Sequence, residues 1–309
     1  MVMPTADTAG EARTRPGSAP AWFVRALSDR PRAGRLTVAG AGVAHAVWGQ
    51  CGQPGLVLVH GGGANRAWWD HIAPWFADTH RVIAVDLSGH GDSDHRPVYR
   101  MDTWVDEVWA TAQAAGAGPR PVLVGHSLGG FVAVATAARH GRDVGGVIVV
   151  DSPMTAPDHE LSSSALRVGG RTGTAYSSLE EIVARFRTIP PQAVYLDYIV
   201  AHVARRSVRR FEDGWRWKYD SRVFTQFAGG MRASALPLLA DVRCRFALLA
   251  AEHGLVTPRI GSAICDTLGR STPVVWLPDA GHHPMLDQPL ALVSAVRAVL
   301  AGWGSSIPL

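Results

Sequence analysis

Gly125-His126-Ser127-Leu128-Gly129 joins two apolar segments of the chain. The residues before it, 121–124, form a short run of branched side chains that predicts a buried strand. The residues after it, 131–138, predict a helix packed closely on a sheet. A strand, a Gly-Xaa-Ser-Xaa-Gly turn and a helix in this order are typical of a nucleophile elbow, in which the serine is the nucleophile. We expect a Cβ atom at either glycine to crowd the neighbouring strand and helix.

Length and composition indicate an ordinary globular protein. With 309 residues, of which 47% are hydrophobic, the chain suits one large α/β domain or two small ones. It has no apolar run of about 18 residues, so we expect no membrane span. The net charge is only +4, and Lys218 is the only lysine among many arginines, so we expect no nucleic-acid partner. We interpret the basic cluster at 205–210 as a solvent-exposed face, with attraction of an anionic substrate as the alternative.

The three cysteines, Cys51, Cys244 and Cys265, are scattered and lack the spacing of metal ligands. They argue against a disulfide scaffold and predict a cytoplasmic location. We expect no metal and no organic cofactor, because the mechanism inferred from the motifs below requires neither. Residues 1–20 are rich in Ala, Thr, Gly and Pro and contain no apolar segment typical of a signal peptide, so we predict a disordered tail. The sequence leaves the oligomeric state open.

From residue 35 onward, strand and helix patterns alternate, which predicts an α/β fold with a mostly parallel, twisted sheet and helices on both faces. We expect a core of residues 21–151 and 229–309. Residues 152–228 interrupt the alternation and predict an inserted helical cap, with helices at about 179–187 and 192–208. The strands are expected at 35–40, 43–49, 56–59, 81–86, 121–124, 144–150, 245–251 and 273–277, and the core helices at about 66–77, 103–115, 131–138, 260–268 and 290–300.

A glycine-rich loop, His60-Gly61-Gly62-Gly63, directly follows the predicted strand 56–59. Its small residues would allow the backbone to approach a developing oxyanion, so we predict an oxyanion hole made by the amides of Gly62 and Leu128. The alternative is a plain turn between a strand and a helix. We expect His60 to brace this loop rather than to transfer protons.

The candidate base is His282, which lies in Ala280-Gly281-His282-His283-Pro284 after the last predicted strand. The order of serine before histidine matches the arrangement of serine hydrolases that use an elbow. His283 is the alternative, but as its neighbour it should point the other way.

By these motifs the chain resembles enzymes of the α/β-hydrolase fold over nearly all of residues 35–303. The resemblance rests on five elements: His60-Gly61 followed by Trp68, Asp86 with the Gly89–Ser93 loop, the elbow, Gly281-His282 with Pro284, and Gln288-Pro289. It implies the fold and the Ser127–His282 pair, but it says little about the substrate.

The catalytic acid departs from the common pattern of that family. Many members carry an aspartate after the seventh strand, where this chain has Gly254 in Ala251-Glu252-His253-Gly254. A smaller set of esterases and dehalogenases has its acid at the end of the sixth strand, where this chain has Asp151. We predict Asp151 as the acid, with Glu252 as the alternative and an acid elsewhere as the third option.

These residues predict a serine hydrolase that cleaves carboxylic esters, and by extension thioesters or lactones, with an apolar group on a small-molecule substrate. The predicted substrate pocket contains Gly63, Trp68, Met154, Trp215 and His283. A carbon–carbon bond hydrolase or a cofactor-free perhydrolase could use the same residues. A receptor without turnover on the same scaffold is the alternative from another class, because the usual position of the acid is empty.

Overall fold

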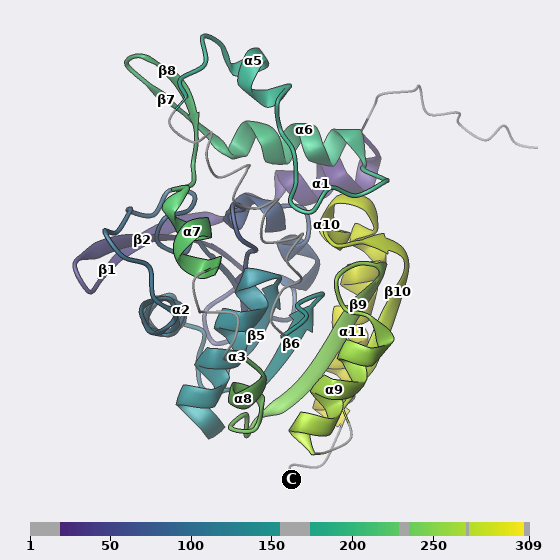
Figure 1. The fold of residues 1–309 in the computed structure, drawn as a ribbon. Helices are drawn as coiled ribbons and strands as arrows, with labels where there is room; N and C mark the ends of the chain where they lie inside the picture. Colours follow the sequence, from purple (N-terminus) through teal and green to yellow (C-terminus); the bar gives the residue numbers. More distant parts are fainter. Residues whose placement is uncertain (1–18, 155–173, 229–234, 270–271, 306–309) are drawn as a thin grey trace, which may run out of the picture.

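A sheet runs through the core of the computed structural model, which describes residues 19–154, 174–228, 235–269 and 272–305 (Figure 1). Eight strands of the described residues form it in the order β1-β2-β4-β3-β5-β6-β9-β10. They are β1 (Arg32–Val38), β2 (Ala41–Trp48), β3 (Gly55–Val59), β4 (Arg81–Val85), β5 (Val122–His126), β6 (Gly146–Val150), β9 (Arg245–His253) and β10 (Val274–Gly281). β2 pairs antiparallel with β1 on one side and with β4 on the other. The remaining neighbours in this order, from β4 through β3, β5, β6 and β9 to β10, are parallel. The predicted fold class is therefore confirmed.

The strands in the middle of the sheet are buried on both faces. On β3, Leu56 and Leu58 pack into one hydrophobic cluster, while Val57 and Val59 pack into the other, as the two-residue period of a strand requires. One face is covered by α2 (Met101–Ala114), α3 (Leu128–His140), α8 (Ala235–Leu239) and α9 (Pro258–Leu268). The other is covered by α1 (Ala21–Ser28), η1 (Arg66–Trp69), η2 (Ala73–Phe76) and α11 (Pro289–Ser305). Short turns of η3 (Gly141–Asp143) and α10 (Pro284–Asp287) complete the core.

The helix predicted over 66–77 is wrong, because this segment forms the two short 3-10 helices η1 and η2. Pro74 explains the interruption, since a proline lacks an amide proton and clashes with the preceding turn inside a helix. The sequence patterns also missed α1, which begins at Ala21 and buries Phe23 in the core.

The described part of the inserted segment 152–228, for which we keep the name cap, contains α5 (Leu179–Val183), α6 (Asp197–Arg206), the hairpin β7 (Val208–Phe211) and β8 (Gly214–Trp217), and α7 (Arg222–Ala228). Figure 1 shows α5, α6 and the hairpin together at the top of the molecule, with α1 beside α6. The cap is therefore not purely helical, and both predicted helices were too long. The helix predicted over 192–208 ends at Arg206 as α6. The carbonyl of the next residue, Ser207, instead accepts a hydrogen bond from the amide of Lys218, and this bond begins the pairing of the β7–β8 hairpin.

Several predictions concern the ends of the chain and its cysteines. Residues 1–18 of the predicted tail lie outside the described residues. The three cysteines carry thiols rather than disulfide bonds, and the buried Cys244 directly precedes β9. Among the described helices, none has both the length and the apolar character needed to cross a membrane.

Candidate active site

Ser127 occupies the sharp turn between β5 and α3. Its backbone has φ 51° and ψ −117°, a left-handed conformation that costs energy for a residue with a side chain. The flanking glycines make the turn possible, because a Cβ at Gly125 would lie 2.2 Å from the Gly129 carbonyl oxygen. A Cβ at Gly129 would lie 2.3 Å from the Val59 carbonyl oxygen on β3. The expected crowding of strand and helix is thus confirmed.

The structure brings Ser127, His282 and Asp151 together at the carboxyl ends of β5, β10 and β6. His282 Nε2 lies 3.1 Å from Ser127 Oγ, and His282 Nδ1 lies 2.6 Å from Asp151 Oδ2. A carboxylate only accepts hydrogen bonds, so Nδ1 carries the proton and Nε2 is free to accept one from the serine hydroxyl. The imidazole and the carboxylate are both buried. This is the geometry expected of a nucleophile, a base and an orienting acid.

Asp151 is held as an anion by its surroundings. Burial by itself would raise the pKa of this carboxyl, but the hydrogen bond and charge of His282 and the amides of Leu255 and Val256 hold the pKa below its usual value. The Ala251 amide donates a further hydrogen bond to Oδ1. The carboxylate is therefore fixed in position as well as in charge.

Gly254 and Glu252, the two residues considered at the usual position of the acid, lie differently. A Cβ at Gly254 would be 2.2 Å from Asp151 Oδ2, so Asp151 occupies the space that a side chain at 254 would need. Glu252 is exposed and accepts a hydrogen bond from the Asp279 amide at 2.9 Å. The structure does not bring Glu252 to His282.

The predicted oxyanion loop lies against the start of α3. A Cβ at Gly62 would be 3.8 Å from the side chain of Leu128, so the two residues are neighbours. Leu128 is the first residue of α3, where amides have no partner within the helix and attract negative charge. The two residues that carry the predicted donor amides are therefore neighbours, and Leu128 directly follows Ser127.

Two buried histidines support this arrangement. His60 Nδ1 donates to the Gly61 carbonyl and His60 Nε2 accepts from the Leu87 amide, and burial lowers the pKa of His60 to about 4. His60 is thus neutral and bonded to its own loop. The sequence patterns missed the role of His126, whose Nε2 donates to the His282 carbonyl at 2.8 Å. Burial, assisted by the charge of His282, lowers the pKa of His126 to about 3. Its place directly before Ser127 was the available signal.

A cavity of about 430 Å³ opens beside these groups. Of the predicted pocket residues, Gly63, Trp68 and His283 line it, together with Gly62. Its other walls come largely from the cap, including Phe186, Trp217, Tyr219 and Phe224. The rings are in contact, since Trp68 lies 5.5 Å from His283 and 6.1 Å from Phe186 between centroids.

Met154 and Trp215 do not line this cavity, so both predictions are wrong. Met154 is fully buried in the hydrophobic cluster that α3 shares with the sheet. Trp215 exchanges backbone hydrogen bonds with Tyr176 near the tip of the hairpin. Trp217, two residues further along β8 and about 7 Å away, lines the cavity instead.

Comparisons with known proteins agree with this geometry. The model of the alpha/beta hydrolase family matches residues 56–296. The chain belongs to the alpha/beta hydrolase family. An esterase of Mycobacterium tuberculosis is 27% identical over 80% of this hydrolase and 83% of its own length. A pimeloyl-[acyl-carrier protein] methyl ester esterase of Edwardsiella ictaluri is 28% identical over 81% and 95%. The crystal structure of an E-2-(acetamidomethylene)succinate hydrolase superposes with a TM-score of 0.77 at 21% identity, covering 88% of the hydrolase and 99% of that chain.

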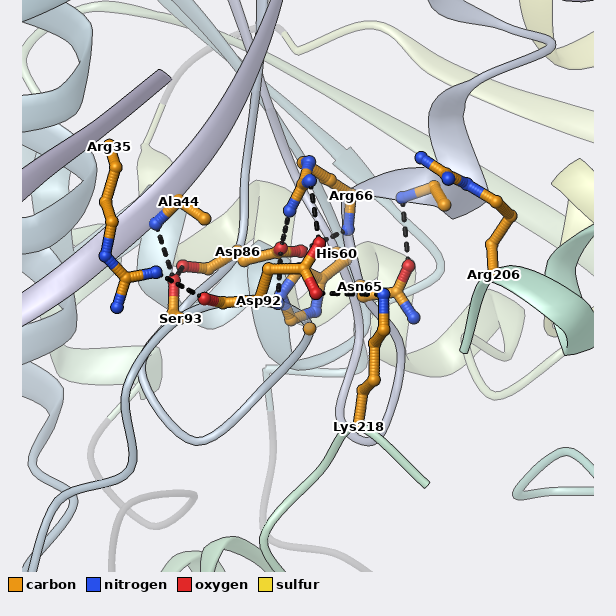
Figure 2. A network of polar contacts seen from close by, with 12 residues as sticks. Arg35, Ala44, His60, Asn65, Arg66, Asp86, Asp92, Ser93, Arg206 and Lys218 are labelled. Carbon is orange, nitrogen blue, oxygen red and sulfur yellow. Dashed lines mark hydrogen bonds and ion pairs between the residues drawn. The ribbon is translucent and has the colours of Figure 1, made fainter. Parts of the chain in front are cut away.

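An ion-pair network joins the cap of the hydrolase to Arg66 and to the loop that contains Asp92 (Figure 2). Arg66 binds the buried Asp86 and, at 2.8 Å, Asp92. From the cap, Lys218 and Arg209 reach Asp92 at 2.8 and 2.9 Å. Burial would raise the pKa of Asp92, but the hydrogen bonds and charges of these bases outweigh it and hold the pKa well below its usual value. The Asp92 carboxylate therefore joins Arg209 of β7 and Lys218, which directly follows β8, to Arg66 of the core.

Replacing Asp92 by asparagine is expected to lower the free energy of unfolding by about 1–2 kcal/mol at pH 7, since the carboxylate is partly exposed. The folded-state pKa of Asp92 is lowered, so its contribution is complete above about pH 4 and is lost as the pH falls further. Urea denaturation at pH 7 and below pH 4 measures this, with the exposed Asp78→Asn as the control. The same difference between wild type and Asp92→Asn at both pH values would contradict the role of the charge.

Two groups of described residues have the proximity needed for a metal ion. The ligand atoms of His126, His282 and His283 lie within 4.8 Å of one another, and so do those of the exposed group Glu252, His253 and Asp279. In the first group, His282 already bonds Ser127 and Asp151, which is the arrangement of a base rather than of a resident metal ligand.

Proposed function

We propose that this hydrolase cleaves carboxylic esters through an acyl-enzyme intermediate on Ser127, and that thioesters and lactones are chemically related substrates. The proposal rests on one observation, the buried hydrogen-bonded series from Ser127 Oγ through His282 to Asp151 at 3.1 and 2.6 Å. The two relatives described above are both esterases, which supports the same class of reaction.

The mechanism follows from the positions of these groups. His282 takes the proton of Ser127 Oγ as the oxygen attacks the ester carbonyl, and Asp151 stabilises the resulting imidazolium. The amides of Gly62 and Leu128 hold the tetrahedral oxyanion. His282 then gives its proton to the departing alkoxide, which leaves as an alcohol. A water molecule, deprotonated by His282, attacks the acyl-enzyme. The bond to Ser127 Oγ then breaks, His282 returns the proton to Oγ, and the carboxylic acid is released.

The experiment is the hydrolysis of p-nitrophenyl butyrate combined with a fluorophosphonate probe. We expect continuous release of p-nitrophenolate, and loss of activity in proportion to the fraction of protein labelled. Mass spectrometry of the digested protein should place the label on the peptide that contains Ser127. Release no faster than in buffer, or a label on another residue, would refute the proposal.

The receptor alternative depended on the glycine at the usual position of the acid. Since Asp151 fills the space beside Gly254, that glycine is no longer a reason to expect a protein without turnover. A receptor would be recognised in the same experiment by thermal stabilisation with an ester and no release of product.

A further inference from the structure

The cavity beside the candidate active site continues from the oxyanion loop to the cap. Gly62 and His283 line it near the catalytic groups, and Arg185, Phe186 and Arg187 line it on the cap. Trp68 bridges these walls, because its ring contacts those of His283 and Phe186. A substrate whose carbonyl lies at Ser127 would therefore extend the rest of its length toward the two arginines.

The charged residues among those described in the cavity lining are all positive. Arg185 and Arg187 are among the described residues that line it, whereas no aspartate or glutamate is. Burial, with the charges of His282 and His126, lowers the pKa of His283 far enough to keep it neutral. Burial raises the pKa of Tyr219 to about 12, so this phenol is neutral as well. The wall is thus apolar and aromatic with two fixed positive charges.

The two arginines differ in how their charges are compensated. Arg185 forms an ion pair with Glu181 at 3.3 Å and lies over the Tyr176 ring. Arg187 donates through Nη1 to the carbonyls of Ala184 and Phe186, and no carboxylate of the described residues pairs with it. Its guanidinium therefore has no carboxylate partner among the described residues, and its Nε and Nη2 donors form no hydrogen bond with them.

The structure assigns to Arg187 the binding of a carboxylate on the substrate, with Arg185 as a second positive charge beside it. The substrate class is a half-ester of a dicarboxylic acid, in which a short apolar chain separates the ester from the free carboxylate. Such a molecule matches the cavity along its length. Its ester lies at Ser127, its apolar chain meets the aromatic walls, and its carboxylate fits the planar guanidinium of Arg187. This inference rests on the proposed ester hydrolysis at Ser127.

The test compares two methyl esters of equal length. Monomethyl adipate carries a terminal carboxylate, and methyl 5-carbamoylpentanoate carries a neutral amide of nearly the same shape. Kinetics followed by NMR at low salt should give a kcat/KM about tenfold higher for the anionic ester, because hydrogen bonds to charged groups are the stronger ones. Monomethyl succinate and monomethyl glutarate then report the preferred chain length.

Arg187→Gln should remove this preference by raising KM for monomethyl adipate about tenfold. An unchanged thermal unfolding midpoint shows that the variant is folded, and the readout is the ratio of kcat/KM between the anionic and the neutral ester, which should fall to about one. The matched control is Arg210→Gln, since Arg210 is exposed on β7 and does not line the cavity.

The outcomes separate this inference from the function on which it rests. If the neutral ester is hydrolysed but the wild type shows no preference for the anionic one, the carboxylate site is refuted and the esterase proposal stands. A preference that survives in Arg187→Gln also refutes it. If neither methyl ester nor p-nitrophenyl butyrate is hydrolysed, both proposals fail.

Discussion

Ser127→Ala is expected to lower kcat for p-nitrophenyl butyrate by about 10⁶-fold, as loss of the nucleophile does when a triad acts as a unit. The hydroxyl is the group that His282 Nε2 approaches at 3.1 Å, and alanine leaves His282 and Asp151 without a group to activate. The left-handed backbone at position 127 is kept by the turn itself, so the fold should survive. The remaining rate is measured from p-nitrophenolate release by purified protein at high enzyme concentration over several hours.

The matched control for this variant is Ser28→Ala. Ser28 is an exposed serine at the end of α1 that bonds only the nearby Arg25 carbonyl, so its loss should leave kcat unchanged. A Ser127→Ala protein that is folded and retains more than about a thousandth of the wild-type rate would show that another residue carries the chemistry.

The sheet could be predicted from the sequence because each central strand is buried on both faces. Segments such as 56–59 and 144–150 are continuous apolar runs, and the structure places strands at Gly55–Val59 and Gly146–Val150. The strand at the edge was harder to bound. The edge strand β10 has exposed as well as buried residues, so its apolar pattern did not mark its end. We predicted that it ends at residue 277, whereas it extends to Gly281.

The cap was predictable as an interruption but not in its content. Its hairpin is a pair of four-residue strands whose residues are mostly exposed or half-buried, so no apolar alternation marks them. For the same reason the pocket was only partly predicted. Trp215 and Trp217 look equivalent in the sequence, and only their places along β8 distinguish them, since Trp215 pairs with Tyr176 and Trp217 lines the cavity.

The elbow and the candidate base could be found because turns and strand ends constrain residue types locally. The acid could not be fixed in the same way, since Asp151 and Gly254 are about a hundred residues apart and each makes sense only beside the other. The fit between the Asp151 carboxylate and the space beside Gly254 becomes visible only in the folded structure. It explains why an empty position after β9 coexists with a complete hydrogen-bonded series at Ser127.

Asp151→Asn is expected to lower kcat by about 10⁴-fold, while Glu252→Gln stays within about twofold of the wild type. An asparagine amide cannot both accept the Nδ1 proton of His282 and supply the negative charge that stabilises the imidazolium. Its NH₂ group would favour the wrong tautomer, with Nδ1 as acceptor and Nε2 protonated toward Ser127. Glu252 is the fitting control, because it is an exposed carboxylate near the end of the neighbouring strand β9 and bonds the Asp279 amide instead. The kcat values of the two variants should be compared at pH 7, after thermal unfolding has shown that both are as stable as the wild type. A large loss in Glu252→Gln and a small one in Asp151→Asn would place the acid at Glu252, near the end of β9, and remove Asp151 from the reaction.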